Sequence, residues 1–432
     1  MAEGRKPKVV IVGAGFGGIN LAKDLRHTDF DILIIDRRNY HLFQPLLYQV
    51  ATAGLSSDEI TYPVRSIFRK NPNVDFRLAE VESVDFNAKT LHTSNGPVEY
   101  DYLVLAPGSV TNFFGLESVA KNGFELKDID DAEAIRNQIL TMFELASYEA
   151  DPKKCRALRT FVIVGGGPTG VESTGALTEL VHLVLSKDYS KLSTDQVKIT
   201  IVEMMDRLLP GFPEELSKDA EETLKRKGVE LRLGYTLDNY DGKKVTFKGG
   251  ETLDTYTVIW AAGVKAESLM DRLGLEQAKQ GRVVVERTLQ IPGHPEVFAI
   301  GDVAYLEEDG QPLPMVAPVA IQQAKLVGRN LRRLVRGRSL KTFDYQDPGS
   351  LATIGRNSAV ARIGRFQFHG FIAWIAWLVV HLFWLIGFRN RLVVLVNWAW
   401  DYFLYDRAVR LISPQTGEEK LPETVAPPVP ER

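Results

Sequence analysis

The sequence predicts an α/β fold with two Rossmann-like dinucleotide-binding domains, the second inserted into the first, plus a C-terminal helical membrane-anchoring segment. Two glycine-rich turns, at residues 13–18 and 165–170, each follow an apolar strand and open a helix. Five of the six tryptophans lie between residues 374 and 400. The repeated strand–turn–helix pattern indicates parallel sheets, and the tryptophan-rich end indicates a surface built for a different solvent.

The overall composition excludes several classes of protein. The 432 residues carry a net charge of −3, so no global basic field would draw the chain to nucleic acid. Cys155 is the single cysteine, which rules out an intrachain disulfide and a paired-thiol redox centre. The seven histidines show no metal-ligand spacing, and we expect no metal site. The polar N-terminus lacks a signal-peptide core, so we place the body of the protein in the cytoplasm.

Apolar runs and glycine turns predict the elements of both domains in order. The first domain begins with a strand at residues 8–13, a helix to about residue 27, and further strands at 31–36, 74–78 and 102–106. Helical periodicity at 130–149 leads into the second domain, with strands at 160–164, 198–203 and 257–261 and a helix from the glycine turn to about residue 185. A strand at 296–300 and a helix at about 319–335 return the chain to the first domain.

This order predicts the domain boundaries. We expect the first part of one nucleotide-binding domain at residues 1–115, the inserted domain at 116–284 and the second part of the first domain at 285–345. The membrane-anchoring region is expected at 346–417, and the proline-rich end at 418–432 is expected to be a disordered tail.

The first glycine turn has the spacing of a dinucleotide cradle. Gly13 permits the tight turn, Gly15 lets a pyrophosphate approach the backbone, and Gly18 permits close packing of helix and strand. The helix N-terminus adds unpaired N–H groups for the phosphates. Asp36 ends the next strand, 18 residues after Gly18, where a carboxylate can hold the ribose hydroxyls.

The second turn repeats the spacing with Gly165, Gly167 and Gly170. Its acid is Glu203, 33 residues after Gly170, which exceeds the usual interval of about 20 because a longer helix and a polar loop intervene. A carboxylate at this position accepts from a free 2′-hydroxyl and repels a 2′-phosphate. We therefore predict a preference for NADH over NADPH.

Two dinucleotide folds in one chain suggest two dinucleotides, one held permanently and one exchanged. Gly301 and Asp302 follow a late strand, where a carboxylate suits the ribityl chain of a flavin. A Gly-Asp pair elsewhere would more simply be a turn. Its position after a strand late in the chain favours the flavin interpretation.

The C-terminal block contains 18 residues, 371–388, with one histidine and no formal charge. Three structures fit it: a membrane span, a buried core or dimer helix, and a helix lying in the membrane interface. The dense tryptophans and the flanking Arg365, Arg389 and Arg391 favour the interfacial helix. A second apolar stretch at 392–404 is too short to span. Four arginines at helical spacing (Arg329, Arg332, Arg333 and Arg336) form either a face for anionic headgroups or an ordinary solvated face.

Several motifs are similar to those of type II NADH dehydrogenases, the non-proton-pumping NADH:quinone oxidoreductases. They are FQPLLYQVATAG at 43–54, GGGPTGVE at 165–172, WAAGV at 260–264, FAIGD at 298–302, VAPVAIQQ at 316–323, GSLATIGR at 349–356 and RNRLVVLVNWAW at 389–400. The resemblance implies FAD in the first domain, NADH in the inserted one, and a membrane quinone (ubiquinone or menaquinone) as acceptor. It also implies monotopic attachment to the lipid bilayer, on the cytoplasmic face of a bacterial inner membrane, and a homodimer.

The resemblance also implies the site residues. Glu172 would position NADH or relay protons; without the resemblance, it would only complement a helix dipole. Pro318 stands where many relatives have a glutamine, which shifts the expected quinone contacts to Gln322, Gln323 and the backbone near Ala320. The expected cofactor-binding residues are Gly13, Gly15, Phe16, Gly17, Gly18, Asp36, Arg37, Gln44, Val81, Ala106, Gly108, Gly301, Asp302, Ala320, Gly165, Gly167, Thr169, Gly170, Glu203, Ala262 and Gly263.

Two other functions fit the nucleotide motifs. One is an NADH-dependent flavin reductase that passes electrons to a small redox protein. The other is a low-turnover flavoprotein whose redox state regulates a partner. A docking face for a redox protein is usually charged, whereas this chain has a tryptophan-rich apolar terminus, which favours the quinone.

Overall fold

The computed structural model describes residues 5–189, 192, 196–404, 407 and 409–412. The first sheet has six strands in the order β21-β22-β9-β1-β2-β5. Their bounds are β1 (Lys8–Val12), β2 (Asp31–Asp36), β5 (Val74–Leu78), β9 (Tyr102–Leu105), β21 (Gln290–Ile291) and β22 (His294–Ala299). All neighbours pair in parallel except β21 with β22. The sheet is covered by α1 (Phe16–Leu25) and α10 (Ala317–Leu334), which pack on each other.

The second sheet has five parallel strands in the order β11-β18-β12-β13-β14. They are β11 (Phe124–Glu125), β12 (Thr160–Val164), β13 (Lys198–Glu203), β14 (Glu230–Leu233) and β18 (Thr257–Trp260), with α5 (Ile129–Tyr148), α7 (Pro168–Glu179) and α9 (Glu214–Arg226) packed around them. All five strands fall between β9 and β22 in the chain. The predicted insertion of one Rossmann-like domain into another is therefore confirmed, while the residue boundaries of the domains stay predictions.

Continuous apolar runs explain the central strands of both sheets. The residues of β1 from Val9 to Val12 and those of β12 are buried, as parallel strands covered on both faces must be. The helix expected to reach residue 185 leaves α-helical geometry early: α7 ends at Glu179 and continues as a π-helical segment, η3 (Leu180–Leu185).

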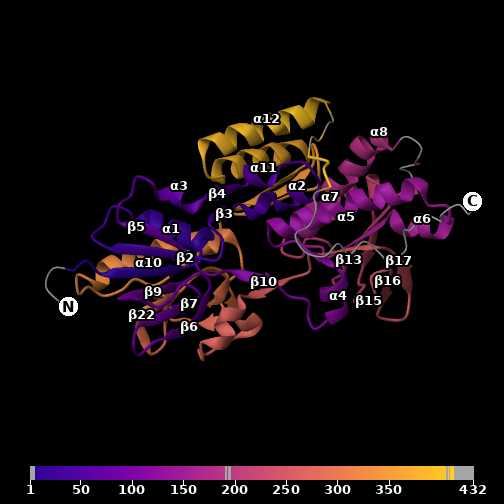
Figure 1. Cartoon of the computed structure of the whole chain (residues 1–432). Helices are drawn as coiled ribbons and strands as arrows, with labels where there is room; N and C mark the ends of the chain where they lie inside the picture. Colours follow the sequence, from indigo (N-terminus) through magenta and orange to yellow (C-terminus); the bar gives the residue numbers. More distant parts are fainter. Residues whose placement is uncertain (1–4, 190–191, 193–195, 405–406, 408, 413–432) are drawn as a thin grey trace, which may run out of the picture.

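The chain crosses between the two domains on a pair of short strands. β10 (Ser109–Thr111) and β19 (Val264–Ala266) pair antiparallel, with Ser109 opposite Ala266. Figure 1 shows β10 between the body that contains β1 and the body that contains β13. This ribbon brings the ends of the two nucleotide-binding domains together.

Smaller elements complete the two bodies. They are β3 (Tyr40–Leu42), η1 (Gln44–Leu46), α2 (Leu47–Ala51), η2 (Ser57–Glu59), β4 (Thr61–Pro63), α3 (Val64–Phe68), β6 (Val81–Asp85), β7 (Thr90–Thr93), β8 (Val98–Glu99), α4 (Glu117–Asn122), α6 (Pro152–Leu158), α8 (Ser186–Asp188), β15 (Leu237–Tyr240), β16 (Lys244–Phe247), β17 (Thr252–Asp254), η5 (Ser268–Arg272), η6 (Lys279–Gly281), β20 (Val283–Val284), η7 (Gly301–Val303), β23 (Ala304–Tyr305), β24 (Glu307–Glu308) and β25 (Gln311–Pro312).

The C-terminal region is a three-stranded sheet followed by two helices. The strands are β26 (Ser350–Thr353), β27 (Ala359–Ile363) and β28 (Phe366–His369), and the helices are α11 (Gly370–Trp384) and α12 (Phe388–Leu404). The apolar stretch at 371–388 is therefore not one helix, which corrects the sequence interpretation. The chain breaks at residues 385–387, where Gly387 has a left-handed φ of +92° that favours glycine. Figure 1 shows α11 and α12 together on one edge of the molecule.

Within the described part of the chain, no helix has the length and apolar character needed to cross a membrane. The predicted tail at 418–432 lies outside the described residues. The arginine face of α10 is partly occupied, because Arg332 pairs with Asp24 at 2.7 Å and Arg333 donates to the Ser339 carbonyl. These contacts favour the solvated-face interpretation of that helix.

Candidate functional site

The first glycine turn has the backbone geometry of a dinucleotide cradle. Gly13 has a φ of +105°, and a methyl group there would overlap the Ala106 carbonyl oxygen. A methyl group at Gly18 would overlap the Gly13 carbonyl oxygen, so helix and turn can touch only because residue 18 is glycine. Gly15, in contrast, faces open space, as a residue must where a pyrophosphate approaches. The turn therefore fits the nucleotide predicted for it.

The second turn repeats this arrangement. Gly165 has a φ of +115° and packs against Ala261 and Ala262, and a methyl group at Gly170 would overlap the Gly165 carbonyl oxygen. Gly167 again faces open space. The same three constraints operate at both turns, so both are preformed for a dinucleotide.

The acidic residues after the two second strands make matching hydrogen bonds. Asp36 accepts from the amide N–H groups of Ala14 (2.6 Å) and Arg38 (2.8 Å). Glu203 accepts from those of Gly166 (2.5 Å) and Met205 (2.8 Å). Glu203 therefore holds the same place at the second cradle as Asp36 does at the first. The extra residues of the longer interval lie in the helix and loop ahead of β13. Burial raises the pKa of Asp36 above its ordinary value, against the lowering effect of these backbone N–H groups.

A half-buried lysine, Lys127, contacts the first cradle, although no sequence motif predicts it. Asp302, on η7, accepts from the Ser109 hydroxyl, which in turn accepts from Lys127 Nζ at 2.9 Å. Burial lowers the pKa of Lys127, and the charge of Asp302 opposes that shift. Gln44 donates to the Lys127 carbonyl at 3.1 Å. Sequence reasoning missed Ser109 and Lys127 because a single serine or lysine in a linker follows no motif.

The structure places the other expected cofactor residues around the two turns. Arg37 pairs with Glu267 at 3.4 Å, and a methyl group at Gly301 would lie 3.2 Å from the Ala320 side chain. Phe16 and Thr169 lie at the starts of α1 and α7, Ala262 and Gly263 follow β18, Gly17 is buried in α1, Val81 and Ala106 are buried, and Gly108 has a left-handed φ of +82°. Their contacts with a bound dinucleotide stay predictions.

The two glutamines expected to meet the quinone bind the protein backbone. Gln322 donates to the Gln346 carbonyl (2.7 Å) and accepts from the Gln346 N–H (3.0 Å). Gln323 is fully buried, and its Oε1 accepts from the Gly301 N–H at 2.6 Å. Its Nε2 is buried with no protein partner, an orphaned donor beside the flavin cradle. Neither side chain lines the cavity described next.

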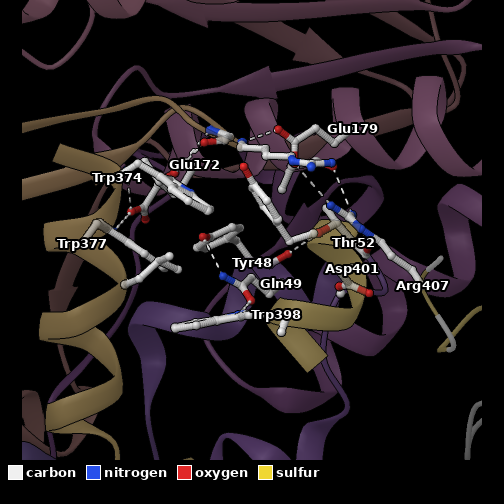
Figure 2. A pocket seen from close by; sticks show the side chains of 18 of the residues that line it. Tyr48, Gln49, Thr52, Glu172, Glu179, Trp374, Trp377, Trp398, Asp401 and Arg407 are labelled. Atoms are coloured by element: carbon white, nitrogen blue, oxygen red, sulfur yellow. Dashed lines mark hydrogen bonds and ion pairs between the residues drawn. The ribbon is translucent and has the colours of Figure 1, made fainter. Parts of the chain in front are cut away.

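A cavity of about 470 Å³ lies between the inserted domain and the C-terminal helices. One end is apolar and is formed by α11 and α12. The other end carries polar groups from α2, α7 and β26 (Figure 2). The apolar lining includes Phe371, Trp374, Ile375, Leu378, Val379, Leu382, Leu395 and Phe403, and the polar lining includes Tyr48, Gln49, Thr52, Glu172, Glu179, Thr353, Arg356 and Arg407.

Glu172 is the buried acid of this cavity. Its Oε1 accepts from Trp377 Nε1 at 3.0 Å and from the Thr353 N–H at 3.3 Å. Burial raises the pKa of Glu172 to about 8, although both hydrogen bonds favour the charged form. Glu172 is the fifth residue of α7, beyond its first turn, and it binds residues of β26 and α11. The helix-dipole interpretation therefore does not explain it.

A second acid ties the end of the chain to the same cavity. Glu179 pairs with Lys227 (3.0 Å) and Arg407 (3.5 Å). Arg407 also donates to the Thr52 carbonyl at 2.7 Å. Figure 2 shows Arg407 and Glu179 on the side of the cavity opposite Trp377. Sequence reasoning missed Glu179, Trp377 and Arg407 because their partners lie far away along the chain.

Comparisons with known proteins agree with this geometry. The model of the pyridine nucleotide-disulphide oxidoreductase family matches residues 7–324, and that of the NDH2 C-terminal domain matches residues 348–407. The type II NADH:quinone oxidoreductase Ndh of Mycobacterium tuberculosis is 37% identical over 448 residues, which cover 98% of this chain and 95% of the relative. The chain belongs to the type II NADH:quinone oxidoreductases.

Other relatives of this type II NADH:quinone oxidoreductase are similar over most of their length. An enzyme of the same name from Staphylococcus aureus is 33% identical over 84% of this chain and 91% of its own. The structure of NDH2 from Plasmodium falciparum in complex with NADH superposes with a TM-score of 0.85 at 21% identity, over 93% of this chain and 99% of that one. A sulfide:quinone oxidoreductase from Aquifex aeolicus shares the fold with a TM-score of 0.67 at 22% identity, over 92% and 95%.

This type II NADH:quinone oxidoreductase is a single-subunit flavoenzyme that oxidises NADH and reduces a quinone without pumping protons. Its cofactors are FAD and NADH. The two cradles fit them, because each turn leaves open backbone for a pyrophosphate and ends in a carboxylate held for a ribose. The orphaned Gln323 donor also lies beside the cradle that carries Asp302. A transfer to a small redox protein is not favoured.

Proposed function

We propose that this enzyme lies on the cytoplasmic face of a bacterial inner membrane and takes ubiquinone or menaquinone from the lipid into the cavity that ends at Glu172. The observation that carries the proposal is the continuity of this cavity from an exposed apolar surface to a buried acid. An apolar quinone partitions into lipid, so a site for it has to open onto that phase.

The exposed face of α11 and α12 is the surface proposed to meet the lipid. Phe383, Phe388 and Phe403 are 72%, 82% and 74% exposed. Other large apolar residues on the two helices share this exposure: Phe371, Ile372, Ile375, Val379, Leu392, Leu395, Val396, Trp400 and Leu404. An apolar patch of this size on a soluble protein marks a contact surface. Its tryptophans and flanking arginines are typical of a helix lying in the membrane interface.

Polar residues on the opposite face of α12 attach the helices to the body. Asn390 donates to the carbonyls of Asp58 (3.2 Å), Glu59 (3.0 Å) and Thr61 (2.9 Å). Asn397 donates to Glu59 Oε1 at 2.5 Å. These contacts fix which face is left for lipid.

The inner end of the cavity supplies what quinone reduction needs from the protein. When bound, FAD accepts hydride from NADH and delivers two electrons to the quinone, which also takes up two protons. A carboxyl group with a pKa of about 8 carries a proton at neutral pH and can donate it to a quinone oxygen. Trp377 and Thr353 hold Glu172 Oε1, and the Tyr48 ring packs edge-on at 6.3 Å from that of Trp377.

The quinone contacts expected from Gln322 and Gln323 move to other groups in this proposal. Because both glutamines bind backbone groups outside the cavity, we place the head group near Glu172 and Gln49 instead. The backbone near Ala320, also expected to contact the quinone, does not line this cavity either, and in this proposal Ala320 keeps only its expected cofactor-binding role. The homodimer stays a prediction, which sedimentation of the purified enzyme in detergent tests.

Substitutions on the exposed face test the proposal without removing buried residues. A triple variant, Phe383→Ser with Phe388→Ser and Phe403→Ser, should lose binding to liposomes and reduction of long-tailed quinones. Its NADH-driven reduction of a soluble dye should be retained. Tyr148→Ser, at a residue of α5 that is 62% exposed, is the matched control. Unchanged liposome binding by the triple variant would refute the attachment face.

A further inference from the structure

An exposed aromatic ring stands beside the NADH cradle on a turn that the mechanism above does not use. Phe114 follows β10 and is 60% exposed. Its backbone φ is +50°, in the left-handed region, and Gly115 follows at +82°. Glycine adopts this region freely, whereas a bulky side chain is strained there. The turn thus holds an apolar ring in solvent at a conformational cost, which folding alone does not explain.

Hydrogen bonds to the end of β18 hold this strained turn. The Asn112 N–H donates to the Gly263 carbonyl at 3.0 Å, and Trp260 Nε1 donates to the Asn112 carbonyl at 2.9 Å. The Asn112 side chain accepts from the Phe114 N–H at 2.9 Å. These hydrogen bonds fix the backbone that carries the Phe114 ring relative to the second cradle.

The ring borders that cradle directly. A methyl group built on Gly263 would lie 2.9 Å from Phe114 Cζ and 3.1 Å from Cε2, so the tip of the ring rests on the glycine. The neighbouring Ala261 and Ala262 pack against Gly165 of the glycine turn. The Trp260 ring is also nearby, with ring centroids 6.5 Å apart and planes tilted by 55°. Much of the Phe114 side chain nevertheless stays uncovered, since it is 60% exposed.

The position of the turn along the chain indicates which part of NADH would reach it. Ser109, at the start of β10, donates to Asp302 in the flavin cradle, and Phe114 lies five residues later at the NADH cradle. Figure 1 shows β10 running between the two bodies. A nicotinamide that extends from the turn at Gly165 towards the flavin would pass this segment.

We propose that Phe114 is a positioning residue that packs against the nicotinamide–ribose half of NADH and holds it on the path to the flavin. The ring supplies flat apolar surface, and its backbone is already fixed before the nucleotide arrives. Preorganised contacts of this kind increase affinity because little is left to order on binding. The proposal rests on the use of NADH by this family and is independent of the membrane attachment proposed above.

Calorimetric titration of the FAD-loaded enzyme with NAD⁺ and with ADP tests this role. Phe114→Ala should weaken NAD⁺ binding about fivefold, in the range of an aromatic contact. It should leave the Kd for ADP unchanged, because ADP lacks the nicotinamide half. Phe114→Tyr should keep the affinity for NAD⁺. Tyr148→Ala, at a similarly exposed ring, should leave the Kd for both NAD⁺ and ADP unchanged.

Phe114→Gly separates binding from folding. Glycine relieves the left-handed strain, so the thermal unfolding midpoint should not fall, while NAD⁺ binding weakens as in Phe114→Ala. If both variants bind NAD⁺ as the parent does, or if NAD⁺ and ADP weaken equally, the proposal is overturned. In either case quinone reduction at saturating NADH would persist, so failure here is distinct from failure of the quinone function.

Discussion

Single residues carry the chemistry that distinguishes the cavity from an ordinary apolar pocket. Glu172 is buried and accepts two hydrogen bonds at one oxygen, and burial is the largest influence on its pKa. The folded-state pKa of about 8 lies above the ordinary value of 4.5. The folded protein therefore binds this proton more tightly than the unfolded chain does.

Because folding raises the pKa of Glu172, the stability of the protein should depend on pH. The free energy of unfolding should decrease as pH rises from about 4.5 to about 8 and change no further above that range, because the charged form is penalised only in the folded state. Glu172→Gln should remove this component of the pH dependence. Urea titrations at several pH values measure the effect, and identical slopes for the two proteins would contradict it.

Quinone turnover should follow the same group. We expect wild-type turnover to decline above about pH 8, as the carboxyl group loses its proton. Glu172→Gln should lower turnover about a hundredfold and remove the decline in turnover above about pH 8, with FAD still bound. Steady-state rates across pH, with flavin content from the absorption spectrum, provide the measurement.

The paired carboxylates at the two cradles support a second prediction at this scale. Asp36 and Glu203 each accept from two backbone N–H groups, so the two sites can be perturbed in the same way. Asp36→Ala should lower the FAD content of the purified protein. Glu203→Ala should keep FAD and raise the KM for NADH about tenfold or more, since it loses charge-assisted hydrogen bonds as well as a ribose partner. If Glu203→Ala lost FAD instead, the assignment of the two domains would be reversed.

At the scale of elements, the C-terminal helices are amphipathic in an unusual sense: one face is exposed and apolar, and the docking face carries the polar groups. Asn390 alone donates to three carbonyls of the segment before α3. Trp398 donates to Gln49 at 2.8 Å, so the contacts between α12 and the body of the protein continue into the cavity. The polar interruptions of the apolar sequence are thus the residues that dock α12.

Asn390→Ala should therefore loosen α12 from the body. The buried Glu59 carbonyl and the part-buried carbonyls of Asp58 and Thr61 lose a donor, and the unsatisfied buried group costs about 1–3 kcal/mol. Reduction of a long-tailed quinone should fall several-fold, while NADH-driven dye reduction is kept. Leu392→Ala, at an exposed position of the same helix, is the control for helix content in hydrogen exchange only, because Leu392 belongs to the proposed lipid-facing surface. Hydrogen exchange of α12 amides measures the loosening, and equal protection in both variants would show that Asn390 does not hold the helix.

At the scale of the whole molecule, the fold connects two nucleotide cradles and one cavity through the β10–β19 ribbon and the C-terminal helices. We predict that NADH bleaches the flavin of the purified enzyme without oxygen and that added quinone restores its colour at a rate no slower than steady-state turnover. Stopped-flow absorbance measures both half-reactions. A flavin that stays bleached with every quinone would instead support the regulatory flavoprotein.

Both Rossmann-like domains and their glycine turns follow from the sequence. Apolar strands, glycine spacing and terminal acids are local signals. They identify Glu203 even though a long loop precedes its strand. The interfacial placement of the C-terminal block stays a prediction, which rests on tryptophan and arginine content rather than on packing. The break between α11 and α12 was missed, since the apolar run continues through it and only the left-handed Gly387 interrupts the backbone.

Composition and local pattern therefore determined that the chain carries two dinucleotide-binding domains and that its C-terminal end is rich in apolar and aromatic residues. Only the tertiary structure decided which residues form the cavity. Glu172 meets Trp377 across 205 positions of sequence, and Glu179 meets Arg407 across a similar interval. The Gln322 side-chain amide, in contrast, is hydrogen-bonded to the backbone of Gln346. Contacts between distant segments arise from the packing of domains against helices, and no local pattern encodes such partners.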